Sequence, residues 1–248
     1  MEQRLFSDIL IKFFEKESWA EDFLSGKLYI NQAGKFITEE NCFRGDDCEG
    51  SQVVSFMNPI LIQFTRIDNE ETIKIPLPPQ TPIKQSFVGA EKVPVLCASG
   101  FNSNNLIKLE NNKYQLSSEY LKYMKQFGMY AVLFSRKELL DKIGKVLKEK
   151  CISAISGNVH YQEYDTSIKT FATVQEQYEQ FFCKYISDDR DYYKQNEWRL
   201  ILCDTALIDK DNDHIVIDIG ALQYAVKANI ENFAGAIMSF HEESEENS

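Results

Sequence analysis

The sequence lacks an excess of basic charge and any long apolar run. It contains 27 Lys and Arg residues against 38 Asp and Glu residues, a formal net charge of −11 with His taken as neutral. This balance excludes a basic nucleic-acid binder that works by neutralising phosphates. A membrane-spanning helix needs about 20 apolar residues, and no stretch approaches this length. Charges also interrupt the apolar pattern of residues 1–17, unlike a signal peptide, so we expect an intracellular protein.

The sequence is also poor in His and in familiar catalytic motifs. Its three histidines, His160, His214 and His241, are scattered, and it has no Gly-x-Ser-x-Gly, Gly-x-x-x-x-Gly-Lys-Ser/Thr or Gly-x-Gly-x-x-Gly motif. These absences disfavour a serine hydrolase, a P-loop nucleotidase and a Rossmann dehydrogenase. There are six cysteines but no close Cys or His ligand pairs. We therefore expect reduced, structural thiols and no zinc site.

The residues that are present predict an α+β protein. With 44% hydrophobic and 26% charged residues, the composition is that of a globular protein. Strand-like and helix-like segments interleave without a regular βαβ period, which favours a mixed, largely antiparallel sheet flanked by helices. We expect a single domain over residues 1–240. Residues 241–248 contain four glutamates and no apolar side chain, so we expect a disordered acidic tail.

Periodicity and capping signals predict the individual elements. Helices are expected over residues 6–14, 19–25 (with a capping box at Ser18 and Glu21), 118–127, 174–184 and 221–229, and after a second capping box at Ser135 and Glu138. Strands are expected over residues 27–31, 93–99, 129–134, 152–161, 197–203, 214–219 and 235–240. Residues 60–77 predict a hairpin that turns at residues 68–71. The twenty residues after the first strand are expected to form a long ordered loop, with a further turn at 209–213.

Two segments could carry chemistry. In residues 41–50, charged side chains crowd around two glycines, which let the backbone turn sharply: Arg44, Asp46, Asp47 and Glu49. They could form a ligand clamp, a self-paired surface loop or a metal site. In the second segment, residues 184–202, strand alternation places Glu197 and Arg199 on one face and Trp198 on the other, in the core. Glu197 and Arg199 form either an exposed ion pair or a carboxylate oriented by a guanidinium at a sheet end.

Seven short segments, taken in order, resemble a family of bacterial, prophage and phage proteins akin to the abortive-infection AbiGi-type proteins. They are Gly-x-Leu-Tyr-x-Asn at 26–31, Arg-Gly-Asp-x-x-Glu-Gly at 44–50, a strand with Cys and Ser at 95–99, a Gly-x-Tyr strand at 128–134, Val-x-Tyr at 159–161, Phe-x-Lys at 182–184 and Glu-Trp-Arg at 197–199. The resemblance implies a role in conflict between phages and bacteria, in the cytoplasm of the bacterial host, with a host or phage protein as the target.

A second similarity is to the ADP-ribosyltransferase-like fold, in which a late glutamate on a strand contacts the ribose of NAD. It implies transfer of ADP-ribose from NAD to a macromolecule, with Glu197 catalytic and Arg199 orienting it. The residues on the ligand side would be Tyr29, Arg44, Asp46, Glu49 and Lys184. The early His-x-Thr element and the Ser-Thr-Ser strand of that fold have no counterpart here, and Ser99 is a distant stand-in.

Two alternatives remain open. One is a non-enzymatic inhibitor or decoy that binds a defence-system protein or ligand, in which the same polar residues hold the fold and an acidic surface meets the partner. The other is a nuclease that uses magnesium bound by Asp46, Asp47, Glu49 and Glu197.

Overall fold

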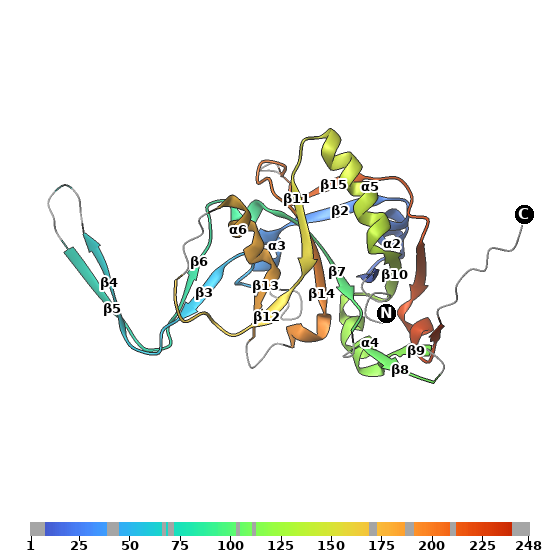
Figure 1. The fold of residues 1–248 in the computed structure, drawn as a ribbon, viewed down its shortest axis with the longest axis horizontal. Helices are drawn as coiled ribbons and strands as arrows, with labels where there is room; N and C mark the ends of the chain where they lie inside the picture. Colours follow the sequence, from blue (N-terminus) through green and yellow to red (C-terminus); the bar gives the residue numbers. More distant parts are fainter. Residues whose placement is uncertain are drawn as a thin grey trace, which may run out of the picture.

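The computed structural model describes residues 8–38, 45–65, 68, 72–102, 105–110, 113–168, 173–186, 191–208 and 212–239. Helices and strands interleave along the chain, which confirms the predicted α+β class (Figure 1). The α-helices are α2 (Glu17–Leu24), α3 (Ala33–Thr38), α4 (Ser118–Met124), α5 (Arg136–Glu149) and α6 (Val174–Glu179). Short 3₁₀ helices are η1 (Ala90–Lys92), η2 (Lys125–Phe127), η3 (Gln180–Phe182), η4 (Tyr192–Gln195) and η5 (Ile230–Phe233).

Eight strands form the main sheet, and its ladders between described residues are all antiparallel. Six of them follow the order β11-β14-β7-β1-β10-β16, while β2 pairs with β7 and carries β15. On the side of β7 away from β14, β2 pairs near Pro94 and β1 pairs near Gly100. The strands are β1 (Ile9–Phe14), β2 (Lys27–Gln32), β7 (Pro94–Gly100), β10 (Tyr130–Ser135), β11 (Ala154–Asn158), β14 (Glu197–Leu202), β15 (His214–Asp218) and β16 (Ala225–Asn229).

Smaller ladders surround this sheet. They are β3 (Gln52–Ser55) with β6 (Pro82–Gln85), β4 (Ile60–Thr65) with β5 (Thr72–Leu77), β9 (Lys113–Leu116) with β8 (Leu106–Lys108) and β17 (Ile237–Ser239), and the parallel pair β12 (His160–Gln162) and β13 (Cys183–Tyr185). The predicted hairpin is confirmed as β4 and β5. Figure 1 shows this hairpin projecting from the body, with β3 and β6 between the two.

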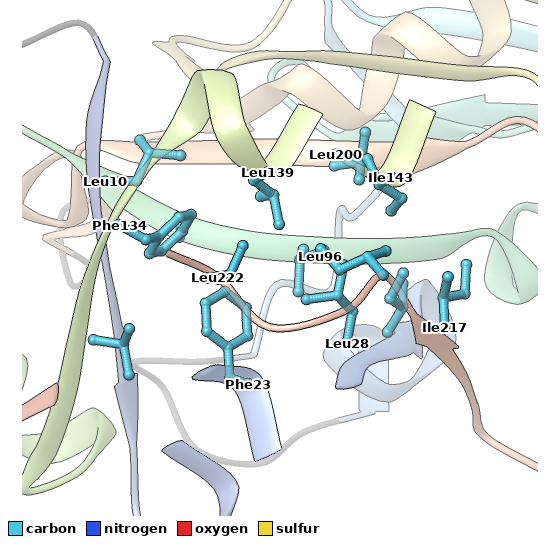
Figure 2. Packing of buried hydrophobic residues seen from close by; sticks show 14 of the residues in the cluster. Leu10, Phe23, Leu28, Leu96, Phe134, Leu139, Ile143, Leu200, Ile217 and Leu222 are labelled. Atoms are coloured by element: carbon cyan, nitrogen blue, oxygen red, sulfur yellow. The ribbon is translucent and has the colours of Figure 1, made fainter. Parts of the chain in front are cut away.

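Helices cover both faces of the main sheet. On one face, Phe23 of α2 and Leu139 and Ile143 of α5 pack in a core with Leu96 and Leu200 (Figure 2). The other face carries two further cores. One centres on Ile11, Ala131 and residues of α4, and the other on Val95, Ile201, Phe181 and residues of α3 and α6.

The predicted alternation of β14 is confirmed. Trp198 and Leu200 belong to the core under α2 and α5, while Ile201 belongs to a core on the opposite face. Every residue of β14 is buried, however, because this strand lies between β11 and β7 and both faces are covered. The exposed version of the Glu197 and Arg199 ion pair is therefore wrong.

The helix predicted over residues 6–14 is also wrong in its described part, which is strand β1. Leu10 and Ile11 are adjacent yet both buried, in cores on opposite faces of the sheet. A central strand buried on both faces produces a dense apolar run that fits helical spacing by chance. Phe6 lies outside the described residues.

The helix predicted over residues 221–229 is wrong: residues 221–224 are not helical, and residues 225–229 are the edge strand β16 paired with β10. The helix predicted over residues 174–184 ends earlier, and Lys184 lies on β13. The predicted loop after β2 begins with helix α3. Residues 39–44 and the tail lie outside the described residues, as does most of the turn at 209–213.

One predicted capping box fails and the other forms in part. The N-cap of α2 is Lys16, without a side-chain hydrogen bond. At α5, Ser135 Oγ accepts the N–H of Glu138 at 3.1 Å, as predicted. The Glu138 carboxylate instead accepts the N–H groups of Gln223 and Tyr224, at 2.7 and 2.8 Å, and so ties α5 to the chain before β16.

Two further expectations concern thiols and membranes. Cys48, Cys97, Cys151, Cys183 and Cys203 are free thiols, as predicted, and Cys42 lies outside the described residues. Within the described ranges, the structure has no helix with both the length and the apolar character needed to span a bilayer.

Candidate functional site

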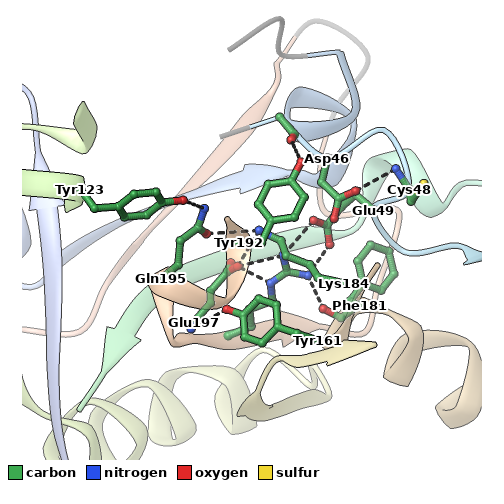
Figure 3. Close-up of polar contacts among 12 residues, drawn as sticks. Asp46, Cys48, Glu49, Tyr123, Tyr161, Phe181, Lys184, Tyr192, Gln195 and Glu197 are labelled. Carbon is green, nitrogen blue, oxygen red and sulfur yellow. Dashed lines mark hydrogen bonds and ion pairs between the residues drawn. The ribbon is translucent and has the colours of Figure 1, made fainter. Parts of the chain in front are cut away.

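Five charged side chains from distant parts of the chain meet beneath the main sheet. We call this the charge cluster: Asp46, Glu49, Lys184, Glu197 and Arg199 (Figure 3). Glu197 and Arg199 come from β14, Lys184 from β13, and the other two from the turn after residue 44. All five are buried, with exposed fractions of 1% to 6%. The sequence predicted each of these residues as a site residue, and folding brings them together.

Arg199 is the centre of the charge cluster. Its Nη1 and Nη2 donate to the two carboxylate oxygens of Glu49, at 2.5 and 2.9 Å. Its Nε and Nη2 donate to Glu197, at 2.8 and 3.3 Å. Nη1 also donates to the carbonyl of Phe181. A guanidinium has five N–H donors, so these five bonds use all of them.

Glu197 is held by two cations. Its Oε1 accepts from Arg199, and its Oε2 accepts from Arg199 and from the ammonium of Lys184, which lies 2.8 Å away. Burial alone would raise the pKa of Glu197, but Arg199 and Lys184 hold this pKa well below its usual range. Glu197 is therefore a paired carboxylate.

Lys184 is a buried lysine with three kinds of partner. Besides Glu197, it donates to the Gln195 side-chain oxygen at 3.3 Å and lies 4.6 Å from the ring centre of Tyr192. Burial would lower the pKa of Lys184, but the Glu197 charge raises it above its ordinary value. Gln195 continues the network to the hydroxyl of Tyr123 at 3.4 Å.

The charge cluster holds three acidic groups against two basic ones, an excess of one negative charge. Asp46 Oδ1 accepts the N–H of Cys48 at 3.0 Å, but Oδ2 is buried without a hydrogen-bond partner among the described residues. Burial raises the pKa of Glu49 to about 7, helped by the charges of Asp46 and Glu197 and opposed by Arg199. One proton bound by the charge cluster would cancel its excess negative charge.

The structure places the remaining predicted ligand residues elsewhere or outside its description. Tyr29 is half-exposed on β2, where its ring stacks on His214 of β15 at 3.9 Å and lies 6.0 Å from the ammonium of Lys35. These contacts are separate from the charge cluster. Arg44 lies outside the described residues. Ser99, the distant stand-in for the Ser-Thr-Ser strand, is paired with Glu197 in the ladder between β7 and β14. It is therefore a backbone neighbour of the predicted catalytic residue.

Several residues of the network escaped sequence reasoning. The Tyr161 hydroxyl accepts the backbone N–H of Glu197 at 3.0 Å, and the Tyr192 hydroxyl donates to the carbonyl of Gly45. Gln195, Tyr123 and the Phe181 carbonyl complete it. Tyr192 and Gln195 belong to residues 184–202, one of the two segments that the sequence singled out, and Tyr161 ends the Val-x-Tyr motif at 159–161. Tyr123 carries no local signal.

A possible metal-ligand group lies beside the charge cluster. Ligand atoms of Asp46, Asp47 and Cys48 lie within 4.8 Å of one another. The ammonium of Lys84 pairs with Asp47, and burial with nearby carboxylates raises the pKa of the Cys48 thiol to about 12. Glu49 and Glu197, the other two predicted magnesium ligands, direct their oxygens at Arg199. These four carboxylates therefore do not converge on one cation.

Comparisons with protein-family models, with curated proteins and with solved structures found no match.

Proposed function

We propose that this protein is a non-enzymatic inhibitor or decoy that binds a host or phage protein during conflict between phages and bacteria. The observation that carries the proposal is the state of Glu197. Both of its carboxylate oxygens accept hydrogen bonds from Arg199 and Lys184, and its side chain is buried. A carboxylate so engaged acts as a structural anion, which leaves binding as the function that the site supports best.

The charge cluster has the properties of a structural unit. Arg199 joins the turn at Glu49, the end of η3 and strand β14, while Lys184 joins β13 to the same strand. Removal of one partner of a buried pair costs about 3–5 kcal/mol of stability because the remaining charge is left unpaired. The cluster therefore supports the proposal by giving these residues a role in the fold.

The proposed biological role, in conflict between phages and bacteria, is supported by two features of the sequence. The order of seven short motifs resembles the abortive-infection family, and this supports a place in the bacterial cytoplasm. The net charge of −11 supports recognition of a partner with complementary charge.

ADP-ribosyl transfer is the second candidate, favoured by one observation. Among the described residues, the charge cluster has one more acidic than basic side chain, and a buried oxygen of Asp46 has no hydrogen-bond partner; perturbed buried charges often gather at functional sites. In this candidate Glu197 would hold a ribose hydroxyl of NAD, which requires that Arg199 or Lys184 release it first.

One assay separates the two. The purified chain is incubated with labelled NAD and bacterial lysate, beside Glu197→Gln, which keeps the side-chain shape and removes the charge. We expect no label transfer from either protein. Transfer by the native chain that the folded Glu197→Gln variant has lost would establish the enzyme and overturn the proposal.

A further inference from the structure

The projecting hairpin has one face made only of apolar side chains. We call β4 and β5 the arm. Cross-strand partners in an antiparallel ladder point to the same side, and the register pairs Ile60 with Leu77, Ile62 with Ile75, and Phe64 with Ile73. These six residues form the apolar face of the arm. The opposite face carries Leu61 paired with Pro76, Gln63 paired with Lys74, and Thr65 paired with Thr72.

Half of this apolar face is open to solvent, while Ile60, Ile62 and Leu77 are partly buried. Phe64, Ile73 and Ile75 are 56%, 57% and 43% exposed, and Figure 1 shows the arm reaching away from the body. A two-stranded hairpin alone is marginally stable in water, and a contiguous exposed apolar patch typically marks an interaction site. The arm therefore has the properties of a segment that another molecule covers.

Buried residues and hydrogen bonds anchor the base of the arm to the body. Val53 and Val54 of β3 are fully buried, and the N–H of Val53 donates to the Tyr185 hydroxyl at 2.9 Å. The Gln52 side chain donates to Asp165 at 3.1 Å, and β6 pairs with β3 along its length. The body thus holds the base of the arm while the arm itself projects into solvent.

We propose that the arm inserts its apolar face into an apolar groove of a different protein, one whose groove has basic residues at its rim. This inference rests on the proposed function and names its binding surface. The groove would cover the apolar face and the edges of both strands and would leave the opposite face, with Gln63 and Lys74, in solvent. The rim would be basic because the whole chain is acidic.

A second copy of this chain is a poorer occupant. Six residues per strand and two strands outline a face of about 20 by 10 Å, whereas a stable interface buries about 800 Å² on each partner. Two flat arms packed face to face bury only this face, whereas a concave groove also covers the edges of both strands and so buries more. Two copies would also bring together net charges of −11 each, which repel.

A membrane is a poorer occupant for a related reason. Bacterial and host membranes present anionic headgroups, which attract clusters of Lys and Arg and repel acidic proteins. The apolar face contains no basic residue, and Lys74 points to the opposite side of the arm. A protein groove therefore fits the charges better than a lipid surface.

The first stage of the test uses photo-crosslinking from each face of the arm. Benzoylphenylalanine is placed at position 64, on the apolar face, and as a matched control at position 63, on the opposite face of the same strand. Both full-length proteins are irradiated in bacterial cells, with and without phage infection. We expect position 64 to give one dominant adduct with a different protein. An adduct with this chain itself, a lipid adduct, or no adduct would overturn the proposal.

The second stage measures the affinity of the purified captured protein for variants of the arm, because capture alone does not show which residues make the contact. Ile75→Lys is expected to weaken binding about tenfold or more, as expected for a central apolar contact. Gln63→Lys adds the same charge on the other face and should change affinity by less than about twofold. Affinity should fall as salt rises, as expected for a basic rim. Equal effects of the two substitutions, or no salt dependence, would contradict the proposal.

The two proposals fail in distinguishable ways. If the captured protein binds the chain but is indifferent to Ile75→Lys, the binding function stands and the assignment of the arm falls. If NAD-dependent labelling depends on Glu197, the proposed function falls whatever the arm contacts. Thermal unfolding of Ile75→Lys and of Gln63→Lys checks that the body stays folded. We expect native-like unfolding for both, because β4 and β5 form a two-stranded sheet of their own.

Discussion

Arg199 explains why so many charges lie inside this protein. Its five N–H donors go to Glu49, Glu197 and the carbonyl of Phe181, so one side chain satisfies groups from three segments. Burying a charge is unfavourable unless it is paired and hydrogen-bonded. The planar guanidinium meets this condition with two carboxylates at once, which the single ammonium of a lysine does not do.

Arg199→Met should therefore be strongly destabilising. The substitution leaves Glu49 and part of Glu197 buried without a cation, so we expect the free energy of unfolding to fall by about 3–5 kcal/mol. Urea denaturation followed by circular dichroism measures it. The control is Lys27→Met, which breaks an exposed pair with Asp22 and should change stability by less than about 1 kcal/mol. Similar losses in the two variants would contradict a special role for Arg199.

Glu49 gives a prediction in pH. Its pKa is about 7 in the folded protein against an ordinary value of 4.5, so the folded state binds a proton more tightly than the unfolded state. Protonation of Glu49 therefore contributes fully to the free energy of unfolding below about pH 4.5, and this contribution is lost as the pH rises through about 7. Glu49→Gln removes the titration. We expect native stability minus variant stability to decrease from pH 5 to pH 8, measured by urea denaturation, and a constant difference would contradict the raised pKa.

The sequence predicted which residues belong to the charge cluster, but it did not predict that they are buried and paired with one another. Glu197 and Arg199 follow from strand alternation, and Glu49 and Asp46 from a charged, glycine-rich segment. That they share one buried network depends on contacts between residues about 150 positions apart, which local patterns do not encode. The resemblance also placed Tyr29 among the ligand residues, but Tyr29 lies on the exposed face of β2, because side chains alternate along the strand and Leu28 and Ile30 point into the core.

Elements with two independent local signals were predicted correctly. The helix α5 has both a serine cap and an apolar stripe, and the hairpin of β4 and β5 has alternation on both sides of a polar turn. The segment that became β1 had apolar spacing alone, and no capping signal supported the helix predicted at the segment that became β16. In both cases pairing with β10 decided the structure, since the backbone groups of a sheet need partners that a local pattern does not show.

Two glycines test the packing of these elements. Gly26, which follows α2, has φ +90°, and a Cβ there would lie 2.1 Å from the carbonyl oxygen of Gly220. Gly26→Ala should therefore lower the free energy of unfolding by about 1–3 kcal/mol or more. Gly144, inside α5, has no atom within 4 Å of such a Cβ, so Gly144→Ala should raise stability by about 1 kcal/mol. Thermal denaturation compares the two, and a loss at Gly144 would contradict the packing of α5.

At the scale of the whole molecule, charge and apolar surface are arranged in an unusual way. A charge cluster held by buried ion pairs lies beneath the sheet, while an apolar face lies on an arm that projects into solvent (Figures 1 and 3). An enzyme typically does the reverse, with reactive charges open to a substrate. This arrangement is the physical reason for preferring recognition over catalysis.

The most direct test of this account is the melting temperature of the purified chain measured across a range of NAD concentrations. A ligand that binds the folded state stabilises it, by about 2.7 kcal/mol at a hundred times its dissociation constant. Because Arg199 and Lys184 already occupy Glu197, the account predicts that NAD leaves the melting temperature unchanged. A melting temperature that rises with NAD in the native chain, and stays constant in a folded Glu197→Gln variant, would contradict it.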